Sequence, residues 1–260
     1  MQILNFFLYF VIYSFIGWFY ESLICSIGQK KLVNRGFLSI PLCPIYGFGA
    51  IITILALFGK TDNPVIVFFV SMFLVCLLEY LTSLILEKIF HMRWWDYTNR
   101  PFNIAGRVYL LGAVVFASLS SLLIFFIHPQ IKSFVLGLPH FFVIIFSIFM
   151  FFVIIFDLLS TVRNLSKLNK NLAQIQSSIN RFKSAYAKHS EDFKGFLVDK
   201  FEESEFYNEN IAKLFTDLRK FQIRRIVRSF PHLEMLRYED AWGKFKQKIK
   251  QSQPKKRRKK

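Results

Sequence analysis

The sequence predicts an all-α membrane protein: a polytopic bundle of about five transmembrane helices, followed by a cytoplasmic helical hairpin or coiled-coil region. Hydrophobic residues make up 53% of the chain, although its formal net charge is +17. Only nine of the 34 Lys and Arg residues and six of the 17 Asp and Glu residues lie in residues 1–160. A nearly uncharged part followed by a basic part is typical of a membrane domain with a water-facing region behind it.

The transmembrane domain is predicted over residues 1–160. A spanning helix needs about 20 mostly apolar residues, because the hydrocarbon core is about 30 Å thick and an α-helix rises about 1.5 Å per residue. The second apolar stretch contains several Pro and Gly residues, so whether residues 36–59 span the membrane or re-enter it stays open. The expected spans are about 3–27, 37–58, 64–87, 108–127 and 133–157.

The short loops predict the orientation, because cytoplasmic loops carry an excess of Lys and Arg. Seven such residues lie in the first and third predicted loops, and two lie in the second and fourth. The first and third loops are therefore expected inside the cell. With five spans, the N-terminus lies outside, and the protein is a multi-pass protein of the cell membrane with a cytoplasmic C-terminal region.

Residues 161–250 are predicted to form a cytoplasmic helical region. Apolar residues recur there at alternating spacings of three and four, at Leu165, Leu168, Leu172, Ile175, Ile179, Phe182 and Tyr186. This seam favours either a helical hairpin within the chain or a coiled coil between copies in a homo-oligomer. A weaker seam follows at Ile211, Leu214, Leu218 and Phe221.

The last ten residues, 251–260, are predicted to be a disordered basic tail that ends in KKRRKK. Basic clusters close to the cytoplasmic face of a membrane bind anionic lipid headgroups. We therefore expect membrane lipid as the partner of this tail, in preference to nucleic acid.

Charged and polar residues of the membrane domain are expected to gather at its cytoplasmic side. Glu79, Ser83 and Glu87 are spaced by four residues and so share one face of the third span. Glu21 reaches a similar depth on the first span, counted from the nearest loop. The predicted polar network comprises Glu21, Asn34, Arg35, Glu79, Ser83, Glu87, Asp96, Asn103 and Arg107.

Two interpretations of this network stay open. In one, the residues line a polar cavity in which Arg holds an anionic group and Glu carries a proton or a cation. In the other, ion pairs fasten the helices and bind no ligand. Aromatic residues at the membrane interface are expected at Trp94, Trp95 and Tyr97. A broken helix or close helix packing is expected around Gly36, Pro41, Pro44, Tyr46, Gly47 and Gly49.

No catalytic, nucleotide-binding or metal-binding motif is recognisable in the sequence. The three Cys residues have no ligand spacing, and no pattern of a hydrolase, a metalloprotease or a P-loop is present. We therefore expect no enzymatic activity, no metal and no cofactor, and any ATPase would be a separate chain.

Four ordered blocks of the sequence carry a family resemblance: GWFYES (17–22), NRGFLSIPLCPIYGFGA (34–50), LEYLTSLILEKIFHMRWWDY (78–97) and FNIAGRVYL (102–110). They resemble the bacterial ABC-transporter permease family of type IV, also called CmpB-like, over roughly residues 5–125, with an echo in RIVRSFPHL (225–233). The resemblance implies a small multi-span protein that is labelled a permease. The matching residues are Glu21, Asn34, Arg35, Gly36, Pro41, Pro44, Tyr46, Gly47, Glu79, Glu87, Trp95, Asp96, Tyr97, Asn103, Gly106 and Arg107.

The favoured hypothesis is a permease-like membrane protein with a polar site at the cytoplasmic side of the bundle. The alternative is a membrane scaffold or sensor that transports nothing and recruits a partner through its cytoplasmic helices. A membrane enzyme acting on lipid would rest only on paired carboxylates and an Arg, and ranks last.

Overall fold

The computed structural model describes residues 1–185, 225–227, 229–230 and 233–243. All long elements are helices, which confirms the all-α prediction. The helices are α1 (Gln2–Gln29), α2 (Pro44–Leu57), α3 (Pro64–Phe90), α4 (Leu110–Leu122), the π-helix η1 (Leu123–Ile127), α5 (His128–Leu136) and α6 (His140–Ala185). The strands are two residues long each: β1 (Met92–Arg93) pairs with β4 (Glu234–Met235), and β2 (Asn103–Ile104) pairs with β3 (Val108–Tyr109).

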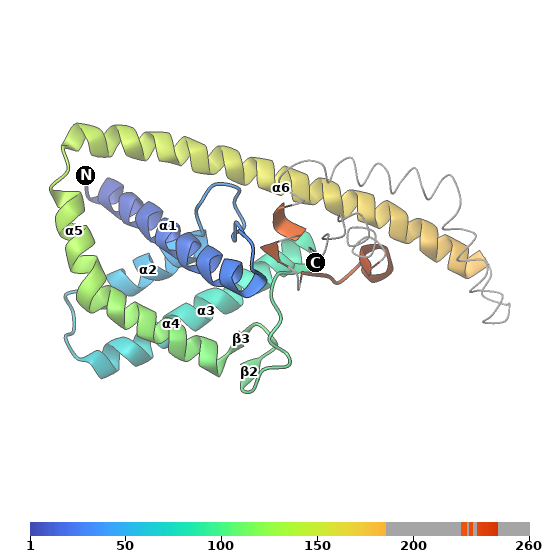
Figure 1. The fold of residues 1–260 in the computed structure, drawn as a ribbon, viewed down its shortest axis with the longest axis horizontal. Helices are drawn as coiled ribbons and strands as arrows, with labels where there is room; N and C mark the ends of the chain where they lie inside the picture. The colour runs from blue at the N-terminus through green and yellow to red at the C-terminus, as the bar shows by residue number, and fades with distance from the viewer. Residues whose placement is uncertain (186–224, 228, 231–232, 244–260) are drawn as a thin grey trace, which may run out of the picture.

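Within the described residues, four helical segments are long and apolar enough to cross a membrane, namely Gln2–Gln29, Pro64–Phe90, Leu110–Leu136 and His140–Arg181. The second predicted span is shorter than expected. Its helix, α2, has 14 residues, which cover about 21 Å at 1.5 Å per residue. Figure 1 shows α2 running back along the bundle between α1 and α3, so the loops before and after it lie at opposite ends.

The shortening of the second span has a local cause. Residues 36–43 form no helix, and α2 starts at Pro44, where the missing N–H and the fixed φ of proline suit a first helical turn. Side chains supply the hydrogen bonds of the preceding backbone: Asp157 accepts from Ser39 N at 2.7 Å, and Arg225 donates to Gly36 O at 2.8 Å. Irregular backbone is tolerated among membrane helices where protein groups satisfy it in this way.

The turn between the last two spans lies at residues 137–139, later in the chain than the expected break at 128–132. His128 is buried, and its ring nitrogen Nδ1 lies 2.8 Å from the Tyr13 hydroxyl. The Lys132 ammonium lies 5.0 Å from the centre of the Phe58 ring. Both residues therefore belong to α5, which begins at His128 directly after the π-helix η1.

The apolar seam of α6 is buried by residues of the same chain. Leu165, Leu168, Leu172, Ile175 and Ile179 pack with residues of the end of α3, of β1 and of the described part of residues 225–243. The second helix of the predicted hairpin lies outside the described residues, so the choice between hairpin and coiled coil stays a prediction. The side chain of Phe182, Tyr186, the weaker seam and the basic tail lie outside the described residues.

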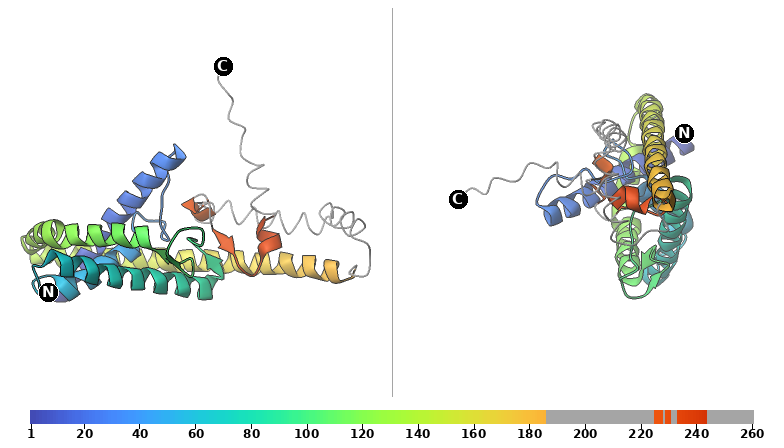
Figure 2. Two further views of the ribbon diagram at one scale, coloured as in Figure 1. Left: turned by 90° about the horizontal axis from the view of Figure 1, so that it is seen from below. Right: turned by 90° about the vertical axis from the view of Figure 1, so that its right-hand side faces the viewer.

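Three segments far apart in the sequence meet at the end of the bundle away from the N-terminus: residues 30–43, residues 91–109 and the described part of residues 225–243. Figure 2 shows the last turns of α1 projecting away from the layer of α3, α4 and α6. The candidate site lies where α1 and α2 face α3 beneath these segments.

Candidate functional site

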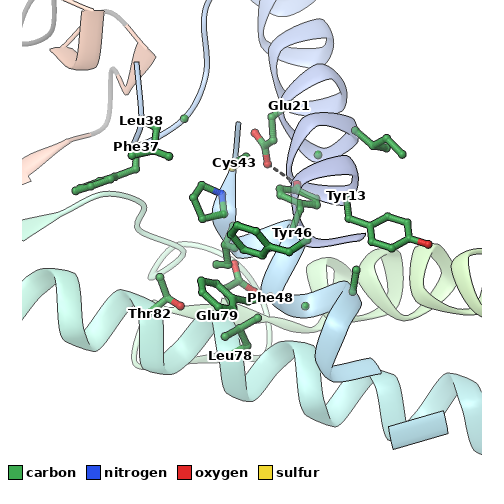
Figure 3. Close-up of a pocket in the computed structure, with 18 of the residues that line it drawn as sticks. Tyr13, Glu21, Phe37, Leu38, Cys43, Tyr46, Phe48, Leu78, Glu79 and Thr82 are labelled. Carbon is green, nitrogen blue, oxygen red and sulfur yellow. Dashed lines mark hydrogen bonds between the residues drawn. The ribbon is translucent and has the colours of Figure 1, made fainter. Parts of the chain in front are cut away.

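A cavity of about 680 Å³ lies between the membrane helices. Its walls come from α1, α2, α3, α4, η1 and α6, together with residues 35–38, Cys43, Trp94, Trp95, Tyr97 and Phe230. In the described part of the chain, its only charged lining residues are Glu21, Arg35 and Glu79. Figure 3 shows Glu21 and Glu79 approaching it from α1 and α3, on opposite walls.

Glu21 is held by two partners. The Tyr46 hydroxyl donates a hydrogen bond of 2.7 Å to Glu21 Oε1, drawn as a dashed line in Figure 3. The Arg35 guanidinium lies 3.6 Å from Glu21 Oε2. This geometry requires close packing of α1 on α2: a Cβ atom at Gly17 would lie 2.2 Å from Tyr46 Cγ, and one at Gly47 would lie 2.2 Å from Ser14 Oγ. Tyr46 and Gly47, which were predicted as packing residues, therefore position the Glu21 carboxylate in the site.

Glu79 differs from Glu21, because its carboxylate makes no hydrogen bond and no ion pair with any residue that the structure describes. Its exposed fraction is 8%, and it lines the cavity beside Thr82 and Leu78. Ser83, one turn further along α3, is buried but does not line the cavity. An ionised carboxylate in a membrane helix is costly to leave unpaired, so such a residue ordinarily marks a functional site.

A second cluster of charges lies outside the cavity. Glu87 Oε2 accepts a hydrogen bond of 2.7 Å from Arg107 Nη1 and lies 3.5 Å from Arg93 Nε. Arg93 also reaches Asp96 Oδ2 at 3.6 Å. The pKa of Arg107 is raised above its usual value, chiefly by its hydrogen bond to Glu87 and further by the charge of that carboxylate. Among the described residues, the charged members of the predicted network therefore form two clusters, and the one with Glu21, Arg35 and Glu79 lines the cavity.

Asp96 and Asn103 shape the loop between β1 and β3. Asp96 Oδ1 accepts from the backbone N–H of Thr98 at 2.9 Å and from its hydroxyl. The Asn103 amide donates to Thr98 O at 3.0 Å and accepts from Gly106 N at 3.0 Å. Gly106 has φ +67°, and a Cβ atom there would lie 2.7 Å from Asp96 Oδ1, so only glycine fits. These residues fold the loop and do not line the cavity.

The predicted interface aromatics, Trp94, Trp95 and Tyr97, all line the cavity. Trp94 is 4% exposed, and its ring centre lies 5.3 Å from that of Phe37 and 4.9 Å from that of Phe230. Directly after β1, Trp94 packs in a core formed with residues of α3, of α6 and of the C-terminal segment. The location of the three aromatic residues at the membrane interface stays a prediction. Burial raises the pKa of Tyr97 above its usual value.

A family model described as "Putative ABC-transporter type IV" matches residues 8–162. The chain belongs to this family. A search of the curated proteins and a search of the solved structures each found no match to the chain. The family match contains both charge clusters and extends past residue 125, where the resemblance in the sequence ended.

Arg225, Ser229 and Phe230 lie beyond the match to the type IV family, yet Phe230 lines the cavity and the other two bind the loop beside it. Arg225 donates to Gly36 O at 2.8 Å and to Phe37 O at 2.9 Å. The Ser229 hydroxyl donates to Asn34 O at 2.6 Å, and Ser229 O accepts from the Arg35 guanidinium. The centre of the Phe230 ring lies 4.2 Å from Arg35 Cζ. Sequence reasoning did not assign these residues to the site, although the echo at 225–233 was the available signal.

Asn34, Gly36 and the two prolines complete the loop between α1 and α2. The Asn34 amide accepts from Trp18 Nε1 at 2.7 Å and donates to Ser39 O at 3.1 Å. Gly36 has φ +147°, while Pro41 is exposed and Pro44 begins α2. Gly49 is not required by close packing, since a Cβ atom there would lie 3.6 Å from the Leu78 side chain, an ordinary van der Waals distance. The loop that presents Arg35 is thus fixed at both ends.

Proposed function

We propose that this chain is the membrane-spanning, permease-like subunit of a transporter and that the cavity between α1, α2 and α3 holds the transported solute. The observation that supports this most directly is the buried carboxylate of Glu79, which faces the cavity without a partner among the described residues. A cavity of about 680 Å³ falls within the range of about 300–1,000 Å³ that is typical of small-molecule sites.

The proposal includes an orientation and an energy source. The excess of Lys and Arg in loops 30–35 and 88–107 favours a cytoplasmic location for this end of the bundle. The sequence has no nucleotide-binding motif, so the family's ABC character implies a separate ATPase chain as the partner that drives transport.

The test compares everted membrane vesicles from cells that produce the wild-type chain, Glu79→Gln or Glu239→Gln. Glu239 is an exposed carboxylate remote from the cavity lining and serves as the matched control. After energisation with ATP, the small-molecule content of the vesicles is compared by untargeted mass spectrometry. We expect Glu79→Gln vesicles to lose solutes that wild-type and Glu239→Gln vesicles retain.

Two outcomes would contradict the proposal. One is a Glu79→Gln chain that inserts at the normal level and gives the wild-type solute profile. The other is a Glu79→Gln chain that fails to insert stably, which would favour a packing role for this carboxylate.

Deletion of residues 161–260 does not separate this function from that of a scaffold or sensor. Phe230 lines the cavity, and Arg225 binds the loop that presents Arg35, so the deletion would alter a transport site as well as a docking region. Point variants of Glu79 leave the cytoplasmic helices intact and therefore distinguish the two functions better.

A further inference from the structure

We infer that the cavity accepts a lipophilic organic cation with a single positive charge and bulky apolar or aromatic groups. This inference rests on the proposed function, because it names the substrate class of the same cavity. Three features of the cavity lead to it: the balance of charge, the nature of the walls and the lack of ligands for a small ion.

The ion pair of the cavity leaves one carboxyl group, that of Glu79, without a partner among the described residues. The Arg35 charge is matched by Glu21 at 3.6 Å, and Arg35 also lies over the ring of Phe230. Glu79 is the remaining charged lining residue in the described part of the chain, and it has no positive partner there. A ligand with one positive charge would supply the missing partner, whereas an anion would add a second buried charge of the same sign.

The walls favour a large cation with spread charge. Aromatic rings surround the space between the two carboxylates, with the Tyr46 ring centre 6.4 Å from that of Tyr20 and 5.8 Å from that of Phe116. Phe48 and Trp95 line the same space. Aromatic faces attract cations within about 6 Å of the ring centre, and most strongly where water is displaced.

The walls do not suit a small hydrated ion. Ions such as Ca²⁺ need about six to eight oxygen ligands to replace their hydration shell. The described residues contain no group of three or more His, Cys, Asp or Glu side chains that could hold a metal ion. Most of the lining is apolar side chain, which instead stabilises the apolar groups of an organic ligand.

The experiment measures binding of three probes of similar bulk to the purified full-length chain in detergent. Tetraphenylphosphonium is a cation, tetraphenylborate is an anion, and triphenylphosphine oxide is neutral. Equilibrium dialysis against the same detergent without protein corrects for uptake by micelles. We expect the wild-type chain to bind the cation at least about tenfold more tightly than either other probe, a difference of about 1.4 kcal/mol.

The variants locate the preference. Glu79→Gln should remove the tenfold preference for the cation, because it removes the unpaired charge and keeps the shape of the side chain. Glu239→Gln should leave the preference unchanged. The comparison of the three probes on the wild-type chain needs no substitution, so it tests the inference even if Glu79→Gln does not fold.

Each other outcome overturns the inference. Equal binding of the cation and the neutral probe would mean that Glu79 presents no charge to the ligand. Tighter binding of the anion would assign the selectivity to Arg35, and absence of binding by all three probes would exclude the substrate class. If the solute content of vesicles still depends on Glu79 in that last case, the proposed transport function stands and only the substrate class is wrong.

Discussion

Arg225 ties residues 225–243 to the loop above the cavity, and its removal should loosen that segment by a measurable amount. Its guanidinium is buried and donates two hydrogen bonds, to Gly36 O and Phe37 O. Hydrogen bonds from a charged group contribute about 1.5–3 kcal/mol each. Burying the guanidinium also costs free energy, and Arg225→Ala removes that cost, which offsets part of the loss of the two hydrogen bonds. We expect a net loss of about 2 kcal/mol in the free energy of local opening, which makes the opening equilibrium constant about 30-fold larger.

Hydrogen–deuterium exchange on the full chain measures this opening directly. The amide N–H of Leu236 donates to His91 O at 3.0 Å and reports release of the segment, while that of Trp242 donates to Tyr238 O at 2.8 Å and reports opening within the segment. Arg225→Lys should give an intermediate effect, because an ammonium lacks the planar fork that reaches two carbonyl groups at once. Burial lowers the pKa of Arg225 to about 10, so the effect should be the same throughout the neutral pH range.

Arg237→Ala is the matched control for this measurement. Arg237 lies in the same segment and is exposed. Its removal should leave exchange at both amides unchanged. Unchanged exchange in Arg225→Ala as well would refute the reasoning, because the apolar contacts of Trp242 and its neighbours would then hold the segment without help from Arg225.

Two further predictions concern the helix contact and the loop. Gly47→Ala should lower the unfolding free energy by about 1–3 kcal/mol, because its Cβ atom would lie 2.2 Å from Ser14 Oγ. Thermal unfolding in detergent measures this loss. A variant that unfolds at the same midpoint temperature as the wild-type chain would contradict the close contact between α1 and α2. The pKa of Asp96 lies below its usual 3.8, chiefly because the Thr98 hydroxyl donates to it. The folded state therefore gains stability above that pH and loses it as the pH falls further. Asp96→Asn should flatten this dependence, and the effect should be small because Asp96 is exposed.

The spanning helices could be predicted from the sequence because hydropathy is a local property of 20 or so residues. Helix ends were harder to predict. His128 and Lys132 look like loop residues in isolation, and their place in α5 depends on Tyr13 and Phe58, which come from distant parts of the chain. The start of α2 likewise depends on Asp157, which accepts the backbone N–H of Ser39. Such contacts leave no periodic pattern in the sequence.

The residues of the candidate site could be predicted from the sequence, but which carboxylate pairs with which arginine could not. Glu79 and Glu87 are eight positions apart on one helix, and periodicity alone gives them the same role. The loop that returns to α3 brings Arg107 to within 2.7 Å of Glu87 and brings no cation to Glu79. The pairing therefore depends on where the fixed loop around Gly106 places a single arginine, and no spacing rule predicts that.

The two interpretations of the polar residues now apply to different sets. Glu87, Arg93, Asp96 and Arg107 are mutually paired outside the cavity and fit the role of fastening the bundle. Packing alone does not account for Glu79, because an unpaired carboxylate at this depth destabilises the folded state, and an apolar side chain of similar size would remove that cost. A residue that costs stability and faces a cavity of ligand size is better explained by what the cavity binds than by what the helices need.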